Sequence, residues 1–261
     1  ALNQWSNHNK GIVIVPMGGF RKLLPPKEMW QKYQLSFSVG SELDLEKITH
    51  QLVIMGYSRA DMVSSPGEFS LRGGILDIYP LTESNPIRIE LFDTEIDSIR
   101  TFSIENQKSM EKVLTVHIGP ATELILEPAN VNRMADLLEE ALRNSLNKIK
   151  NEKSKNLLLQ NVGSEIEQLR SGLKIDTIYK YSSLAYERPA SLLDYLPHDG
   201  LVFLDEISRI QEIATSLEGE ELEWFTNLLD VGEIVHDVQL SFSFTQLMAA
   251  SKKSMIYMSL F

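Results

Sequence analysis

The stretch GEFSLRGGILDIYP, residues 67–80, holds two adjacent glycines between two short apolar runs. Each run has the length and composition of a β-strand. A glycine pair between two such runs is typical of a tight turn. The stretch therefore predicts a β-hairpin with strands at 68–72 and 74–79, and it places Arg72 directly before the turn.

Short strands and turns continue on both sides of this hairpin, from about residue 57 to residue 118. The further strands that we expect are 57–63, 87–92, 96–103 and 111–118. Such a density of short strands predicts a small, largely antiparallel β module.

A strand and a helix precede this β module. LSFSV, residues 35–39, alternates as a half-buried strand does. An apolar stripe predicts a helix over about 44–55, with Ser41 ahead of it and Gly56 as its C-terminal stop.

The two ends of the chain have α/β texture. GIVIVPM at 11–17 and LVFLDE at 201–206 each predict a buried strand, because both are short and rich in apolar residues. Long amphipathic patterns predict two helices that form a hairpin or one long bent helix. The other elements expected in this part are helices at 128–149, 152–172, 207–229 and 244–251, and strands at 234–242 and 254–261. The fold class is therefore α/β, with an inserted small, mainly antiparallel β module.

Composition narrows the function classes. Hydrophobic residues make up 43% of the 261 residues and the net charge is −11, which argues against a surface built to neutralise nucleic-acid phosphates. The chain has no cysteine, so disulfides and thiolate metal sites are excluded, and a cytoplasmic location is expected. No apolar run approaches the ~20 residues that span a bilayer. The first ten residues lack the apolar region of a signal peptide and are expected to follow a cut inside a longer protein.

Asp205 and Glu206 end the LVFLDE run as the carboxylates of a Walker B strand do. Such a site also needs a phosphate-binding loop of the form G-x-x-x-x-G-K-[ST], and the nearest candidate, residues 18–22, lacks that spacing. The alternative is a buried strand followed by an acidic helix N-terminus, which the helix dipole favours.

The sequence does not indicate a metal site or a catalytic nucleophile. The five histidines are scattered without metal-binding spacing, and no nucleophile elbow occurs. Clustered carboxylates lie on helical patterns that are typical of a solvated face. We therefore expect no metal site and no catalytic residue.

The expected strand 87–92, IRIELF, gives the clearest signal of function. Side chains alternate between faces, so the three aliphatic residues share the core face, and Arg88, Glu90 and Phe92 share the other. In the first hairpin strand, Arg72 likewise lies on the face away from Phe69. Arginine beside an exposed aromatic ring is enriched in protein–protein hot spots.

Two interpretations of this face stay open. Arg72 and Arg88 could pair with Glu68, Glu90 or Asp93 on an ordinary solvated sheet, since surface ion pairs are common and weak. Alternatively, the face is a docking surface whose partner is an acidic protein surface.

Three long stretches resemble one protein family. They are MGYSRADMVSSPGEFSLRGGILDIYP, PIRIELFDTEIDSIRTFSIENQKS and IGPATE. The chain resembles the N-terminal part of the bacterial transcription-repair coupling factors (Mfd), a region that is itself similar to the repair protein UvrB. The resemblance is strong over about 11–125 and weaker, but continuous, to the end.

The resemblance implies an architecture of three parts. Residues 1–45 would end a UvrB-like, P-loop-like α/β domain that is incomplete in this chain. Residues 46–118 would be the inserted module that binds UvrA, and residues 119–261 would complete the α/β domain.

The resemblance also implies a function without catalysis. The module would recruit UvrA to RNA polymerase stalled at a lesion, in nucleotide excision repair. The positions that would contact UvrA are Arg72, Arg88 and Phe92, with Glu90 and Arg100 as neighbours. Asp205 and Glu206 would be a degenerate nucleotide site.

Other functions would belong to other parts of a longer protein. The resemblance implies an ATP-dependent DNA translocase whose ATP, Mg²⁺, polymerase and DNA sites lie outside this chain. A contact with the rest of its own chain could keep the docking surface inactive, and no membrane is involved. The alternative function is a UvrB-like fragment that binds DNA or hydrolyses ATP.

Overall fold

The structure is a computed structural model that describes residues 2–3, 11–173 and 175–259. The described residues form two compact units: unit 1 comprises those within 1–11 and 28–125, and unit 2 comprises those within 12–27 and 126–261. Helices and strands are mixed and most strand pairs are antiparallel, so the predicted α/β class is confirmed. The finer division at residues 45 and 118 stays a prediction.

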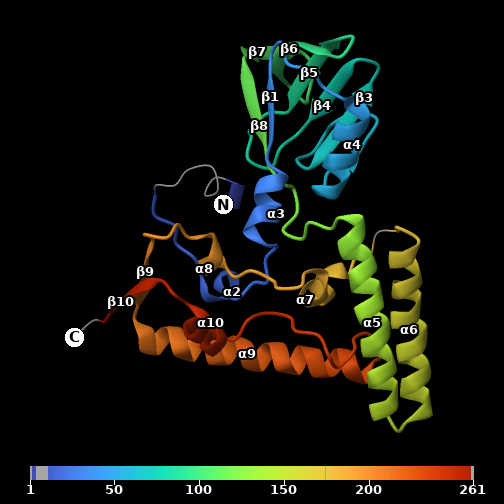
Figure 1. Cartoon of the computed structure of the whole chain (residues 1–261), viewed down its shortest axis with the longest axis vertical. Coiled ribbons are helices and arrows are strands. Elements are labelled where there is room, and N and C mark those ends of the chain that lie inside the picture. The colour runs from blue at the N-terminus through green and yellow to red at the C-terminus, as the bar shows by residue number, and fades with distance from the viewer. Residues whose placement is uncertain (1, 4–10, 174, 260–261) are drawn as a thin grey trace. The chain divides into compact units, whose positions relative to one another are not determined.

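Unit 1 is built on a sheet of six strands in the order β2-β3-β4-β5-β6-β7 (Figure 1). Only the β2–β3 pair is parallel. The elements from residue 27 to residue 118 are α3 (Lys27–Lys32), β1 (Leu35–Ser38), α4 (Leu45–Ile54), β2 (Ser58–Arg59), β3 (Glu68–Arg72), β4 (Ile75–Ile78), β5 (Ile87–Phe92), β6 (Glu95–Phe102), β7 (Ser109–Val113) and β8 (Thr115–Ile118).

One face of this sheet forms the core of unit 1. In an antiparallel pair, directly opposed residues share a face, so Leu76, Ile89 and Ile99 form one row across β4, β5 and β6. All three are buried. The alternation expected for 87–92 therefore holds, with Ile87 and Ile89 in the core.

Local chemistry explains where α4 begins and ends. The Asp44 side chain accepts a hydrogen bond from the Lys47 backbone N–H at 3.0 Å and caps the helix. Gly56 ends it at φ +87°, a conformation that glycine adopts without strain. Ser41, expected as the start signal, instead bonds through its hydroxyl to the Ser38 carbonyl at 2.7 Å.

Two expected strands of unit 1 differ in the structure. The 111–118 segment is two strands, because β7 joins the six-stranded sheet and β8 pairs with β1 in a separate ribbon. The 57–63 strand shortens to β2, because the chain then leaves the sheet and buries Val63 against Tyr79 and Phe102.

Unit 2 contains a helical hairpin, a long helix and one pair of strands (Figure 1). Of the two forms expected for the long helices, the hairpin is observed, with α5 and α6 packed side by side and Leu138 and Val162 buried. The elements are α2 (Met17–Phe20), α5 (Pro128–Lys148), α6 (Glu152–Arg170), the 3₁₀ helix η1 (Ile178–Tyr181), α7 (Ser182–Ala185), α8 (Leu192–Tyr195), β9 (Leu201–Asp205), α9 (Ile207–Asp230), α10 (Phe244–Ala250) and β10 (Ser254–Met258).

Two of the strands predicted in unit 2 are not observed, so these predictions are wrong. The 11–17 run is not a buried strand, since Ile12 and Ile14 are 94% and 92% exposed and no partner strand lies along residues 12–16 in the described chain. The 234–242 segment is irregular, because its backbone N–H groups bond outside any strand ladder. His236 N–H, for example, donates to the Ser145 hydroxyl and Gln239 N–H to the Ser183 hydroxyl.

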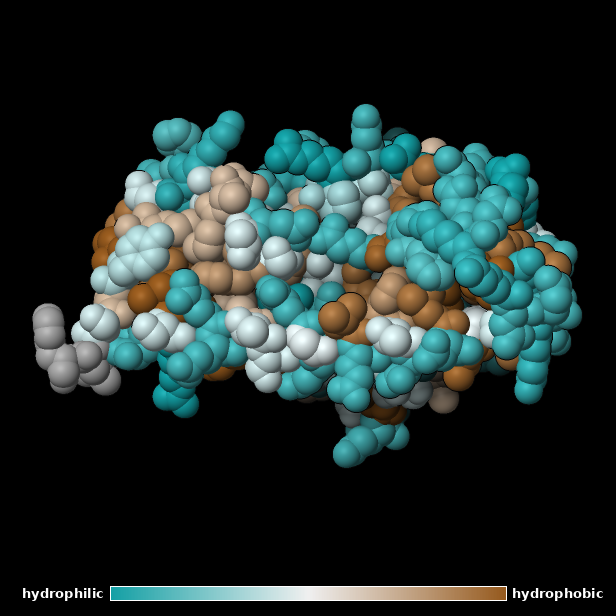
Figure 2. Space-filling model, turned by 90° about the horizontal axis from the view of Figure 1, so that it is seen from below, coloured by the Kyte–Doolittle hydropathy of each residue, from teal (hydrophilic) through white to brown (hydrophobic). Residues whose placement is uncertain are grey.

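The predicted LVFLDE strand exists as β9, but it is not buried as expected. β9 pairs in parallel with β10, and only Leu204 of its five residues is buried, while Phe203 is more than half exposed. Within the described chain this sheet has two strands, so apolar side chains stay uncovered; Figure 2 shows brown atoms at the left, the side on which Figure 1 places β10. No described helix is long and apolar enough to cross a bilayer.

Candidate partner-docking site

The sheet of unit 1 places the predicted site residues on one face. Asp77, Arg88 and Arg100 oppose one another across β4, β5 and β6, so they form a polar row on the face away from Leu76 and Ile89. Arg72 ends β3 on this same face. We call Arg72, Arg88, Glu90, Phe92 and Arg100 the docking surface.

Asp77 lies at the β4 end of the row, within reach of both Arg72 and Arg88, and is fully buried. Its Oδ1 accepts a hydrogen bond from Arg88 Nε at 2.8 Å. Its Oδ2 accepts one from Arg88 Nη2 and one from Arg72 Nη2, each at 2.8 Å. One carboxylate therefore holds two guanidinium groups, and the pair with Arg88 has two parallel hydrogen bonds.

Arg88 is the more enclosed of the two arginines, with a side chain 14% exposed. Its guanidinium lies over the Phe102 ring, 4.4 Å from the ring centre, and Nη1 donates to the Gln107 carbonyl at 3.3 Å. The hydrogen bonds to Asp77 raise the pKa of Arg88, so this group stays charged. Arg72 is freer, since 47% of its side chain is exposed and Nη2 makes its single hydrogen bond within the described chain.

Glu90 and Arg100 form the second pair of the docking surface. Arg100 Nη2 lies 3.2 Å from Glu90 Oε2, and the Ser98 hydroxyl donates to the same oxygen at 2.7 Å. Both charged side chains are about one-third exposed. The pair neutralises itself, so it adds little net charge to the surface.

Phe92 is the exposed apolar member of the surface, 81% accessible at the end of β5. The tight turn that follows begins at Asp93 with φ +58°. The glycine turn lies alongside, because Leu91 N–H donates to the Gly74 carbonyl at 2.8 Å. A Cβ at Gly74 would come 3.2 Å from the Leu91 carbonyl oxygen, so glycine at this position lets the turn pack closely against the Leu91 backbone.

The ion pairs differ from those expected for an ordinary solvated sheet. Arg72 and Arg88 pair with Asp77, and not with Glu68, Glu90 or Asp93. Sequence reasoning missed Asp77. The signal was present, because a lone carboxylate inside the apolar strand ILDIY must be buried with a cationic partner or stay unpaired at high cost.

Asp205 and Glu206 lie far from this chemistry along the chain, at the end of β9 and the start of α9. Asp205 is exposed. Glu206 adopts φ +57°, and its backbone N–H donates to the Met258 carbonyl at 2.9 Å. Their assignment as a degenerate nucleotide site stays a prediction.

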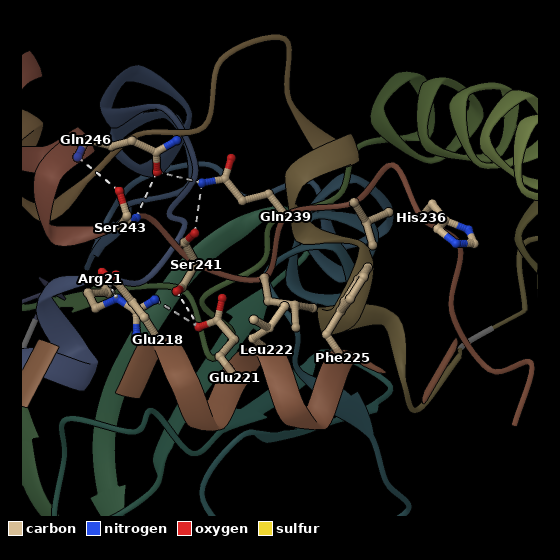
Figure 3. A pocket seen from close by; sticks show the side chains of 12 residues that line it. Arg21, Glu218, Glu221, Leu222, Phe225, His236, Gln239, Ser241, Ser243 and Gln246 are labelled. Carbon is tan, nitrogen blue, oxygen red and sulfur yellow. Dashed lines mark hydrogen bonds and ion pairs between the residues drawn. The ribbon is translucent and has the colours of Figure 1, made fainter. Parts of the chain in front are cut away.

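Residues 18–22 serve a structural network in unit 2. They lie in and after the short helix α2, and the buried Arg21 donates to the Phe242 carbonyl at 2.8 Å and to Glu221 at 3.2 Å. Figure 3 shows this network at the open hollow of about 470 Å³ along α9. The polar groups there bond to one another, which gives Arg21 a role in holding α9.

Known proteins similar to this chain point to one family. Residues 35–124 match the family described as the UvrB interaction domain. Over 260 residues the chain is 46% identical to the transcription-repair-coupling factor of Bacillus subtilis (strain 168). The alignment covers 100% of this chain and 22% of that protein. The chain is homologous to the N-terminal region of the transcription-repair coupling factors.

Two other coupling factors are similar over a somewhat shorter part of the chain. Those of Staphylococcus aureus (strain MRSA252) and Staphylococcus epidermidis (strain ATCC 35984) are 37% and 38% identical over 239 residues. Each alignment covers 88% of this chain and 20% of the relative. The chain thus spans about a fifth of the length of these coupling factors. The interaction-domain match includes every residue of the docking surface.

Proposed function

We propose that this region of a coupling factor is a non-catalytic adaptor that binds UvrA through the docking surface. The observation that carries the proposal is the exposure of Phe92 on the face that also presents Arg72. An exposed aromatic ring beside a half-exposed guanidinium is the composition of an interface hot spot. The match of residues 35–124 to the UvrB interaction domain supports the same assignment.

Phe92 and Arg72 contribute to binding in different ways. Burial of the Phe92 ring in a partner pocket supplies affinity, because its exposed apolar surface leaves water. The cationic group of Arg72 orients an acidic partner during encounter and fixes the register of the complex. An added Cβ at Gly73 would meet no atom within 4 Å, so a partner backbone can approach the turn closely at this residue.

In this proposal the adaptor brings UvrA to RNA polymerase stalled at a lesion. Contacts with the polymerase and with DNA, together with ATP and Mg²⁺, belong to other parts of the longer coupling factor. The adaptor itself needs no bound cofactor, because docking requires only a complementary protein surface.

Titration of purified UvrA against the whole 261-residue chain tests the proposal. Phe92→Ala should weaken binding by about 1–3 kcal/mol, as truncation of a hot-spot residue does. Trp224→Ala removes a half-exposed aromatic side chain from unit 2 and is the matched control. If both variants fold and bind UvrA as the parent chain does, the docking assignment is wrong.

A second titration separates the adaptor from the alternative of a UvrB-like fragment that binds DNA or hydrolyses ATP. Labelled duplex DNA should bind weakly across the salt range, since the chain carries a net charge of −11. Tight DNA binding with a steep salt dependence, or ATP turnover by the purified chain, would favour the alternative.

A further inference from the structure

In the described chain, Asp77 is the one side chain that forms ion pairs with both Arg72 and Arg88 of the docking surface. It is fully buried in β4, between the core residues Leu76 and Ile78 on the strand. Both its oxygens are used, one by Arg88 alone and one by the two arginines together. A change at Asp77 therefore affects both guanidinium groups at once.

Burial of this carboxylate is poorly explained by stability alone. Removing a carboxylate from water is expensive, and apolar replacements of buried ion pairs are often neutral or stabilising. What the carboxylate supplies is geometry, because two flexible side chains are held at fixed points on the surface. A side chain ordered before binding loses less entropy when a partner contacts it.

We infer that Asp77 is the positioning residue of the docking surface, and that the surface takes a partner offering a single carboxylate beside an apolar pocket. This inference rests on the proposed function, since it concerns the same surface. Asp77 itself is covered and contacts no partner. It acts through Arg72, which keeps most of its N–H donors for the partner.

The balance of charges on the docking surface indicates the chemistry of the partner. Asp77 neutralises one of the two arginines that it holds, and this is Arg88, which it holds with two hydrogen bonds and whose side chain is nearly buried. Glu90 neutralises Arg100. Among the five residues of the docking surface, one positive charge is left, at Arg72, on the same face of the sheet as Phe92. An extended acidic tract would leave most of its carboxylates without a counter-charge here.

A double-mutant cycle in the whole chain tests the positioning role. The UvrA affinities of the parent chain, Arg72→Ala, Asp77→Asn and the double variant are compared, with folding followed by circular dichroism. Arg72→Ala and Asp77→Asn should each weaken binding by roughly 10-fold. In the Asp77→Asn chain, Arg72→Ala should add less than about 3-fold, because the unheld arginine no longer contributes fully.

The cycle distinguishes positioning from a purely structural role. If Asp77→Asn lowers stability but Arg72→Ala costs the same affinity in both backgrounds, the positioning role is wrong. If the Asp77→Asn chain does not fold, the cycle is run with a chain that carries both Asp77→Asn and Arg88→Gln. The second substitution removes the Arg88 guanidinium, which would otherwise be buried without a counter-charge. If Phe92→Ala leaves binding unchanged, the proposed function fails; if it weakens binding while the cycle is additive, only this inference fails.

Salt dependence tests the charge of the partner. Arg72→Ala should flatten the dependence of affinity on salt, because it removes the one uncompensated charge among the five residues of the docking surface. Arg170→Ala, at an exposed arginine that pairs with Asp136 and Glu139 in unit 2, is the control and should leave that dependence unchanged. If the Arg72→Ala chain keeps the salt dependence of the parent chain, the single-carboxylate partner is wrong.

Discussion

The guanidinium of Arg88 is held on two sides, with its face 4.4 Å from the centre of the Phe102 ring and its edge on the Asp77 carboxylate. Only a planar group with several N–H donors can make both contacts. The two contacts join the buried cluster of Val63, Tyr79 and Phe102 to the polar row on the same sheet. Arg88 thus belongs to the fold as much as to the docking surface.

Arg88→Lys should therefore be costly although it keeps the charge. Lysine lacks the bidentate geometry and stacks less well on a ring, so we expect a loss of about 1–2 kcal/mol in the free energy of unfolding. Urea denaturation measures the loss. Arg170→Lys, at an exposed arginine that pairs with Asp136 and Glu139, is the control and should change stability little. Equal curves for the two variants would show that the geometry at Arg88 contributes nothing.

Truncation on the two faces of β5 should change stability by very different amounts. Ile89→Ala leaves a cavity in the core and should cost roughly 2–5 kcal/mol of stability. Phe92→Ala removes an exposed ring and should change stability by less than about 0.5 kcal/mol. Thermal melts of both variants check the contrast. A Phe92→Ala chain that melts as early as Ile89→Ala would contradict the placement of Phe92 outside the core.

The sequence was sufficient where the pattern is local. The period of two in IRIELF assigns Ile89 to the core and Phe92 to the opposite face without knowledge of neighbouring strands. Likewise, the capped amphipathic pattern from Pro128 predicts α5 within a residue of its ends. Each prediction depends on side chains within one element.

Predictions that depend on pairing between distant segments were less successful. The β-branched run at 11–17 has the composition of a strand, but a strand needs a partner edge, and none runs alongside residues 12–16 in the described chain. The role of Asp77 also needs the register of three strands, since β3, β4 and β5 bring Arg72 and Arg88 to one carboxylate. Sequence spacing alone does not contain that register.

Gly56 and Gly163 should respond to alanine with opposite signs. Gly56 has φ +87°, and a Cβ there would lie 2.6 Å from the Thr122 Cβ, so Gly56→Ala should cost about 1–3 kcal/mol. Gly163 lies within α6 with no atom within 4 Å of an added Cβ, so Gly163→Ala should add about 0.5–1 kcal/mol of stability. Urea denaturation of both variants measures the effect, and a neutral Gly56→Ala would contradict the backbone geometry at the end of α4.

Glu68 should make part of the stability of unit 1 depend on pH. Hydrogen bonds from the Ser64 and Ser65 backbone N–H groups and the Ser64 hydroxyl, of which the Ser64 N–H has the largest effect, lower the pKa of Glu68. The folded pKa is then below that of the unfolded chain, about 4.3. The stabilisation is fully present above that value and is lost as the pH falls through the folded pKa.

Urea denaturation between pH 7 and pH 3 should show a smaller fall in stability for Glu68→Gln than for the parent chain, since the amide does not titrate. Glu105→Gln, at an exposed position, should follow the parent curve, and a Glu68→Gln curve parallel to the parent over the whole range would contradict the lowered pKa.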